Sequence, residues 1–198
     1  STRAGSRDPV SGGAVIVLGI DPGPETHGAV LYESRARRVL WASKAATPKQ
    51  LWEWFHVHDG LDDVSVLLSE ACDFDRPFTV VIERPAAMGA IGVGVVGHML
   101  DTAWEAGRLA QVALGADCPT YTMTRREVLR HLGVLSGKGS ADSRVRAACI
   151  ADHETPGGPP AVGRKASPGP LYGVTSHAWQ ALGLVLAWLE MKTQREQK

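Results

Sequence analysis

The sequence has few cysteines, no long apolar run and no net charge. Its three cysteines, Cys72, Cys118 and Cys149, lie far apart and form no CxxC pair. This pattern excludes a disulfide framework and a zinc knuckle, and it is typical of proteins from a reducing compartment. The apolar stretches end well before 18 residues, and the N-terminus lacks a basic start followed by an apolar segment. We therefore expect neither a membrane-spanning helix nor a secretory signal.

The absence of net charge argues at first against a nucleic-acid partner. The 21 basic side chains balance the 21 acidic ones, whereas proteins that bind phosphate backbones are usually basic. The charges are segregated along the chain, however. Residues 45–84 hold three basic and eight acidic side chains, and residues 121–149 hold six basic and two acidic ones. We therefore expect DNA contact to be confined to one face, with a modest dependence on salt.

The 198 residues, 44% of them hydrophobic, have the length and composition of a single domain. We expect a disordered leader at residues 1–13, one folded domain at residues 14–192 and a charged tail at residues 193–198. Within the domain, residues 155–172 contain five prolines and four glycines. This composition predicts a long mobile loop that contributes nothing to the core.

Apolar runs between turn residues predict five strands, at residues 14–20, 28–33, 38–42, 78–82 and 119–121. Apolar periodicity and cap residues predict helices that begin at Pro48 and that span residues 98–114, 125–132, 140–152 and 177–191. Thr124 with Glu127 has the spacing of a capping box, and Ser176 is the expected cap of the last helix. A further short helical piece is expected within residues 59–74. This order of elements predicts an α/β fold with a mixed five-stranded sheet flanked by helices.

Three tryptophans, Trp104, Trp179 and Trp188, lie on apolar faces of the predicted helices. We expect them to make core or dimer contacts rather than to stack on bases.

Two carboxylates follow apolar strands directly. Asp21 comes after the run at residues 14–20, beside a glycine turn, and Glu83 comes after the run at residues 78–82. If the two strands are adjacent, both carboxylates can reach one divalent ion, and hard cations prefer oxygen ligands on a rigid platform. The alternatives are an ordinary turn aspartate in an Asp-Pro-Gly sequence and a salt bridge from Glu83 to Arg84 or to another cation.

His177, in the first turn of the last predicted helix, is the third candidate ligand. A metal requires the neutral ring, which the positive end of a helix also favours. Histidine can equally act as a general acid or base near neutral pH. A surface histidine without a catalytic role is the remaining alternative, and the sequence leaves these roles open.

Basic side chains cluster around the Gly-Lys-Gly sequence at residues 137–139, ahead of a predicted helix. Glycines allow backbone amides to approach a phosphate closely, and the N-terminus of a helix attracts anions. A solvated helix face is the alternative. The residues that we expect to contact DNA are Arg125, Arg126, Lys138, Arg144 and Arg146.

Four short motifs follow one another along the chain: Gly-Ile-Asp-Pro-Gly at residues 19–23, Ile-Glu-Arg-Pro at 82–85, Gly-Lys-Gly-Ser-Ala-Asp at 137–142 and Ser-His-Ala-Trp-Gln-Ala-Leu at 176–182. In this order they resemble the motifs of RuvC-type Holliday junction resolvases, which belong to the RNase H-like nuclease superfamily. The resemblance covers residues 14–190. It implies an RNase H-like fold and a homodimeric endonuclease that nicks paired strands of four-way DNA junctions.

The resemblance also implies the cofactor and the site. The positions of Asp21, Glu83 and His177 are those that bind Mg²⁺ in the family, with Mn²⁺ as a substitute. A protein of this kind is expected with DNA in the cytoplasm of a bacterial or phage-infected cell.

The sequence departs from the family pattern at three places. Gln180 stands where an aspartate is usual, which leaves open whether the site binds one or two ions. Ser143 stands where a basic residue often follows the glycine loop, and Lys138, Arg144 or Arg146 can replace that charge. Residues 86–97 are longer and richer in glycine than we expect, which leaves the sequence preference for DNA open.

Two rival functions come from other classes. The first is a junction-binding protein with weak or lost catalysis, which Gln180 suggests. The second is an actin-like phosphotransferase, which shares the glycine turn. Its two-domain body needs a longer chain, and the sequence has no second phosphate loop.

Overall fold

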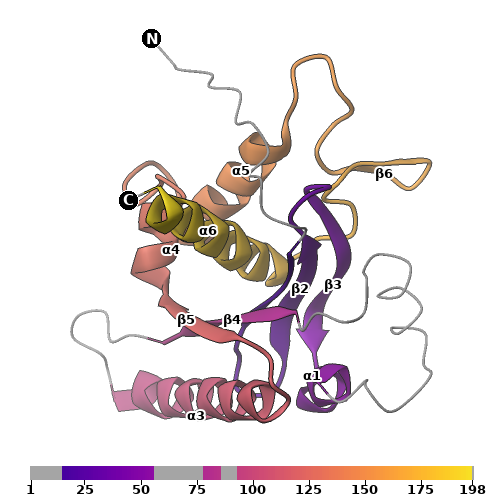
Figure 1. Ribbon diagram of the computed structural model, residues 1–198. Helices are drawn as coiled ribbons and strands as arrows, with labels where there is room; N and C mark the ends of the chain where they lie inside the picture. Colours follow the sequence, from indigo (N-terminus) through magenta and orange to yellow (C-terminus); the bar gives the residue numbers. More distant parts are fainter. Residues whose placement is uncertain (1–14, 56–77, 86–92, 198) are drawn as a thin grey trace.

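A single five-stranded sheet forms the centre of the molecule, with helices on both faces (Figure 1). The computed structural model describes residues 15–55, 78–85 and 93–197. The strands of the sheet are β1 Ile16–Asp21, β2 His27–Glu33, β3 Arg38–Ala46, β4 Thr79–Arg84 and β5 Thr120–Thr124. All five predicted strands are therefore present, and each ends one to four residues further along the chain than predicted, except β2.

The strands lie in the order β3-β2-β1-β4-β5. Strands β1, β2 and β3 form an antiparallel meander, whereas β4 pairs parallel with β1, and β5 pairs parallel with β4. This mixed sheet with helices on both faces is the RNase H-like fold, so the predicted fold class is confirmed.

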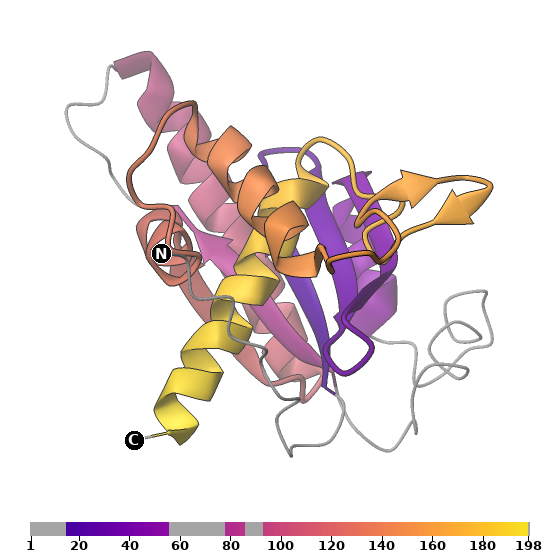
Figure 2. The ribbon, with the colours of Figure 1, turned by 90° about the horizontal axis from the view of Figure 1, so that it is seen from above.

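The helices divide between the two faces of the sheet (Figure 1). Helices α1 Pro48–Phe55 and α3 Val93–Gly115 cover one face, and α4 Arg125–His131, α5 Ala141–His153 and α6 Ala178–Glu196 cover the other. Figure 2 shows α5 and α6 side by side across the sheet. Both faces of β1 are therefore buried, which explains why its sequence is apolar without alternation.

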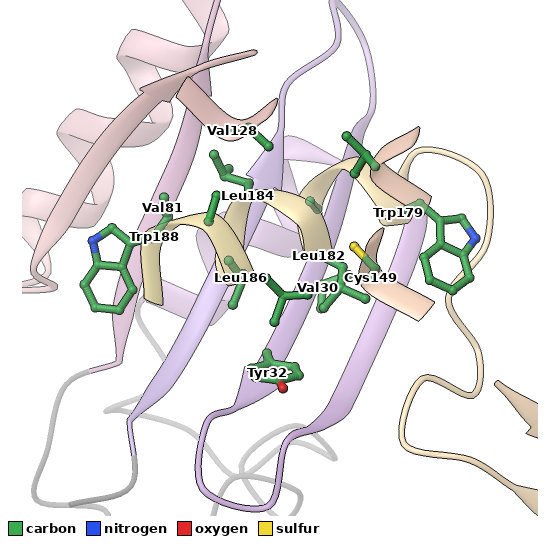
Figure 3. Packing of buried hydrophobic residues seen from close by; sticks show 14 of the residues in the cluster. Val30, Tyr32, Val81, Val128, Cys149, Trp179, Leu182, Leu184, Leu186 and Trp188 are labelled. Carbon is green, nitrogen blue, oxygen red and sulfur yellow. The ribbon is translucent and has the colours of Figure 1, made fainter. Parts of the chain in front are cut away.

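Helix α6 forms the centre of the larger core. It is buried continuously from Ala178 to Trp188, and its apolar side chains pack against Val30 and Val81 of the sheet and against Val128 of α4 (Figure 3). A helix that is apolar all round is typical of a fully enclosed position. This burial fixes α6, and the residues at its start, relative to the strands.

The tryptophan predictions are partly correct. Trp179 and Trp188 are buried near opposite ends of the buried stretch of α6 (Figure 3), so their core role is confirmed. Trp104 on α3 is 75% exposed, so a core role for it is excluded, and its predicted alternative, a dimer contact, stays a prediction.

The helix caps differ in how well the sequence predicted them. Thr124 and Glu127 form the predicted capping box at α4, and Ser140 caps α5 by accepting a hydrogen bond from the Ser143 amide. The prediction that Ser176 caps α6 is wrong. Ser176 has a φ of +46°, whereas a capping serine needs an extended backbone. His177 is the N-cap instead, without a side-chain hydrogen bond to the helix.

The segment at residues 155–172 contributes to the core, contrary to the sequence-based expectation. Ala161 and Leu171 are buried, and the carbonyl of Pro170 accepts a hydrogen bond of 2.8 Å from the amide of Val39. Between them, β6 Gly163–Arg164 and β7 Ser167–Pro168 form a small hairpin. The prolines and glycines here shape tight turns that return the chain to the sheet. The mobility of the segment stays a prediction.

Some predictions lie outside the described residues. These are the leader at residues 1–13, the helical piece within residues 59–74 and most of the glycine-rich segment at residues 86–97. Cys118 and Cys149 are free and buried. Among the described helices, none combines the length and the apolar character needed to cross a bilayer.

A buried histidine links α5 to the sheet. The hydroxyl of Tyr32 donates to Nε2 of His153 over 2.8 Å, and Nδ1 of His153 donates to the carbonyl of Cys149 over 2.9 Å. Burial lowers the pKa of His153, and the Cys149 carbonyl and Asp152 oppose this effect only in part. The ring is therefore neutral in the folded protein at pH 7.

This pKa shift predicts a loss of stability in acid. The unfolded chain takes up a proton at this histidine near pH 6.5, whereas the folded protein does so only at lower pH. The stabilisation is complete above pH 6.5 and is lost as the pH falls towards the folded pKa, by at most about 1.4 kcal/mol per pH unit. Urea unfolding between pH 7.5 and 5.0 should show a shallower pH slope for His153→Gln than for the wild type. Equal slopes would disprove this role for His153.

Candidate functional site

Two carboxylates lie side by side at the carboxyl ends of β1 and β4. The parallel register pairs Ile20 with Ile82, so Asp21 and Glu83 follow on neighbouring strands. Successive side chains of a strand point to opposite faces. Ile20 and Ile82 pack against the α3 face, so Asp21 and Glu83 point to the opposite face, towards the start of α6. The two carboxylates thus lie on neighbouring strands and on the same face of the sheet, and their joint binding of a metal ion stays a prediction.

Two glycines bring the start of α6 close to Asp21. Gly28 is the antiparallel partner of Asp21, and a Cβ atom on Gly28 would lie 2.5 Å from the carbonyl oxygen of His177. A Cβ atom on Gly19 would likewise overlap the carbonyl oxygen of Ala181. Because neither glycine has a side chain, α6 contacts the strands directly and places His177 beside the end of β1.

His177 and the turn after β1 frame Asp21. Nδ1 of His177 lies 3.7 Å from Oδ2 of Asp21, and the His177 side chain is 70% exposed. The Gly23 amide donates to Nδ1 of the buried His27 over 3.3 Å, which fixes the turn that follows Asp21. Asp21 is thus held by the sheet, whereas the ring of His177 remains accessible from outside.

Arg125 lies at the centre of the site. Helix α4 begins directly after β5, and β5 pairs with β4, so Arg125 extends over Glu83. Its Nε lies 3.3 Å from Oε1 of Glu83, and its Nη2 lies 3.6 Å from Oδ1 of Asp142 on α5. Its Nη1 donates a hydrogen bond to Oε1 of Gln180 on α6. One guanidinium group therefore joins β4, α5 and α6.

The positive charge near the acidic side chains of the site only partly offsets the cost of burying them. Burial raises the pKa of Glu83 to about 7; Arg125 opposes this effect, and Asp21 and Asp142 add to it. Burial also raises the pKa of Asp21, against the opposing effects of Arg125 and His177. Oε2 of Glu83 is buried and has no hydrogen-bond partner among the described residues. A carboxylate oxygen in this state is stabilised by an additional cation.

The residues present fit one divalent ion better than two. Asp21 and the unpartnered Oε2 of Glu83 offer the hard oxygen donors that Mg²⁺ prefers. The other polar groups nearby, Gln180 and Asp142, are already engaged by Arg125. Within the described part of the chain, no three His, Cys, Asp or Glu side chains form a metal-binding cluster. An ion here would retain several waters, as Mg²⁺ commonly does.

The predicted DNA-binding residues divide into two groups. Arg126 and Lys138 are exposed on α4 and in the loop before α5. Arg144 donates to the carbonyls of residues 134, 137 and 139, so it braces the glycine loop. Arg146 lies over the ring of Trp179, 5.5 Å from its centroid. Contact of these side chains with DNA remains a prediction.

The sequence missed Asp142 and the inward orientation of Arg125. Asp142 lies in the first turn of α5, where an acidic residue is common because it complements the helix dipole. In the sequence, only the position of Asp142 within the third motif pointed to a role in the site. Glu83 forms its ion pair with Arg125. This arginine begins α4, the helix that follows β5, and lies 42 residues after Glu83 in the sequence.

Comparisons with known proteins give similar solved structures and no sequence match. No family model matches the chain, and no curated protein matches it. RuvC of Thermus thermophilus in complex with Holliday junction substrate is 19% identical, with a TM-score of 0.49 over 91% of this chain and 96% of that chain. A second structure of Thermus thermophilus RuvC is also 19% identical at the same coverage, with a TM-score of 0.47.

Proposed function

We propose that this protein is an endodeoxyribonuclease that resolves four-way DNA junctions by Mg²⁺-dependent hydrolysis of phosphodiester bonds. The observation that carries the proposal is the buried pair of Asp21 and Glu83 at neighbouring strand ends, with an unpartnered carboxylate oxygen. Arg125 pairs with Glu83 through Oε1 only, so a further cation at Oε2 and Asp21 would offset the cost of burying both carboxylates. The order of the four motifs supplies the class of substrate.

The two carboxylates and His177 would have different roles in the reaction. Asp21 and Glu83 would hold the ion, which when bound polarises the phosphate and lowers the pKa of a water molecule. Asp21 would also orient His177 through Nδ1. The exposed His177 ring then faces the substrate and is placed to transfer a proton to or from it.

The loop before α5 would bind the DNA backbone near the site. Gly137 and Gly139 have φ values of +145° and +86°, a backbone conformation that favours glycine. Arg144 holds this loop through three carbonyl groups. Lys138 and Arg126 are then free to meet phosphates without disturbing the loop. These contacts lie on the same side of the sheet as the carboxylates, as expected if one face binds DNA.

Paired nicking of a junction requires two sites, and one chain supplies one, so we propose that the protein acts as a homodimer. Helix α3 presents large exposed apolar side chains: Leu100 is 64% exposed, Trp104 is 75% exposed and Leu114 is 60% exposed. Val96, Leu100 and Trp104 are spaced by four residues and so form one stripe. A second copy of the chain would cover this stripe.

The proposed dimer predicts the effect of a charge on the stripe. Trp104→Glu should convert the dimer to a monomer, because a carboxylate would then be buried without a partner. Size-exclusion chromatography with light scattering measures the change in mass. Tyr172→Glu, at an exposed aromatic residue outside α3, is the matched control and should remain dimeric. A wild-type protein that is monomeric at micromolar concentration would exclude this interface.

One observation favours a second candidate, a junction-binding protein with weak catalysis. Gln180 is neutral and Arg125 fills the space beside it, so the site has fewer free ligands than a site for two ions needs. Incubation of the protein with a synthetic four-way junction, in Mg²⁺ or in EDTA, separates the two functions. We expect nicks only with Mg²⁺ and only in the junction, and none in a linear duplex of the same sequence. Tight binding without nicks in Mg²⁺ or Mn²⁺ would favour the second candidate.

A further inference from the structure

The guanidinium group of Arg125 lies among the polar side chains of the site. Arg125 contacts Glu83, Asp142 and Gln180 at once, and only 21% of its side chain is exposed. These partners come from β4, α5 and α6, which surround it on three sides. Arg125 is therefore held by contacts within the protein, unlike an exposed arginine whose only partner would be DNA.

The neutral Gln180 is matched to this arrangement. It is buried on α6, three residues after His177 and therefore on the same side of the helix. Its side-chain oxygen accepts a hydrogen bond from Nη1 of Arg125. The amide thus holds the guanidinium in place without adding a fourth negative charge to Asp21, Glu83 and Asp142.

Some N–H donors of the Arg125 guanidinium group remain for a ligand. An arginine side chain has five N–H donors in a fixed plane. Nη1 donates one of them to Gln180, and Nε and Nη2 lie 3.3 Å and 3.6 Å from carboxylate oxygens of Glu83 and Asp142. If each of these two atoms also directs one N–H to its carboxylate, about two of the five remain for a ligand. A planar fork of this kind suits phosphate oxygens.

We propose that Arg125 is a built-in cation that takes the place of a second metal ion. The site then binds a single divalent ion, at Asp21 and Oε2 of Glu83, and Arg125 supplies the second positive charge that stabilises the phosphate in the transition state. The role of Arg125 towards phosphate rests on the proposed function, whereas the number of divalent ions that the site binds does not. Gln180 is a positioning residue for Arg125 and not a metal ligand.

Counting bound Mn²⁺ in the absence of DNA tests this proposal. Mn²⁺ is titrated into metal-free protein, and the unbound ion is measured by electron paramagnetic resonance. We expect one ion per chain in the wild type and in Gln180→Asp, because Arg125 still neutralises the new carboxylate. The double variant Arg125→Gln/Gln180→Asp, which frees three carboxylates, should bind two. Arg125→Lys retains the charge and should remain at one.

Several outcomes would overturn the proposal. Two ions, or none, in the wild-type protein would do so, and so would a folded double variant that still binds one. If the double variant does not fold, Gln180→Asp alone decides, because a second ion bound there would show that Arg125 does not occupy the position. Two ions together with nicked junctions would refute the role of Arg125 and leave the nuclease standing. The expected ion counts without nicking would refute the nuclease and leave the single-ion site standing.

Discussion

Asp21→Asn is expected to abolish junction cleavage and to leave junction binding intact. Asparagine has the same shape and retains the turn that follows β1, but it removes the negative charge that a divalent ion requires. We expect a loss in single-turnover rate on the order of 10³-fold or more. The affinity for the junction, measured by gel shift in EDTA, should change little because phosphate contacts lie elsewhere.

The same variant distinguishes a functional carboxylate from a structural one. Burial raises the pKa of Asp21, which means that the folded protein disfavours its charged form. Asp21→Asn should therefore unfold at the same temperature as the wild type or at a higher one. Asp101→Asn, at an exposed position on α3, is the control and should cleave normally. Undiminished cleavage by Asp21→Asn would remove Asp21 from the active site.

Gly19→Ala should cost about 1–3 kcal/mol of unfolding free energy. The added methyl group would overlap the carbonyl oxygen of Ala181 and a methyl group of Val185. Neither can yield easily, because one belongs to the backbone and both lie within the buried length of α6. Helix α6 must therefore shift away from β1, which also moves His177 away from Asp21. Cleavage should fall together with stability.

The matched control is the same substitution at a glycine with open space. Gly97 lies in α3, is exposed, and has no atom within 4 Å of an added Cβ. Alanine is the better helix former, so Gly97→Ala should stabilise the protein by about 0.5–1 kcal/mol. Urea denaturation measures both variants. Gly19→Ala as stable as the wild type would mean that α6 does not lie directly against β1.

The sequence predicted that Asp21 and Glu83 each follow a buried strand, because local patterns determine this. A continuous apolar strand that ends in a carboxylate places that group at the edge of the sheet. Two such strands that pair in parallel bring the groups together at the same edge, and β1 and β4 do so. The neighbouring positions of Asp21 and Glu83 follow from this register, and the buried helix α6 places His177 beside Asp21.

The sequence did not predict the position of Arg125, because no local pattern determines it. A basic residue at the start of a helix indicates solvent or phosphate contact in most settings. Its inward orientation depends on three long-range facts: β5 pairs with β4, α6 brings Gln180 near, and α5 brings Asp142 near. The buried part of residues 155–172 was missed for a similar reason, since its contacts to β3 are tertiary.

The fold shows where the basic segment of the sequence lies relative to the candidate site. The basic segment at residues 121–149 forms β5, α4, the glycine loop and most of α5, and Arg125 at the start of α4 lies against Glu83 at the end of β4. Of its six basic residues, Arg125 faces the carboxylates and Arg144 braces the loop. Fewer side chains than the count suggests are thus available for phosphate contacts, which supports a modest dependence of binding on salt.

The most direct test of the nuclease is to map the cleavage products of a four-way junction. Each of the four strands is labelled in turn, and the junction is incubated with the wild-type protein in Mg²⁺. We predict nicks in two opposing strands at equivalent positions near the branch point, absent in EDTA and with Asp21→Asn. Intact strands at protein concentrations that saturate the junction, with Mg²⁺ and with Mn²⁺, would contradict the assignment.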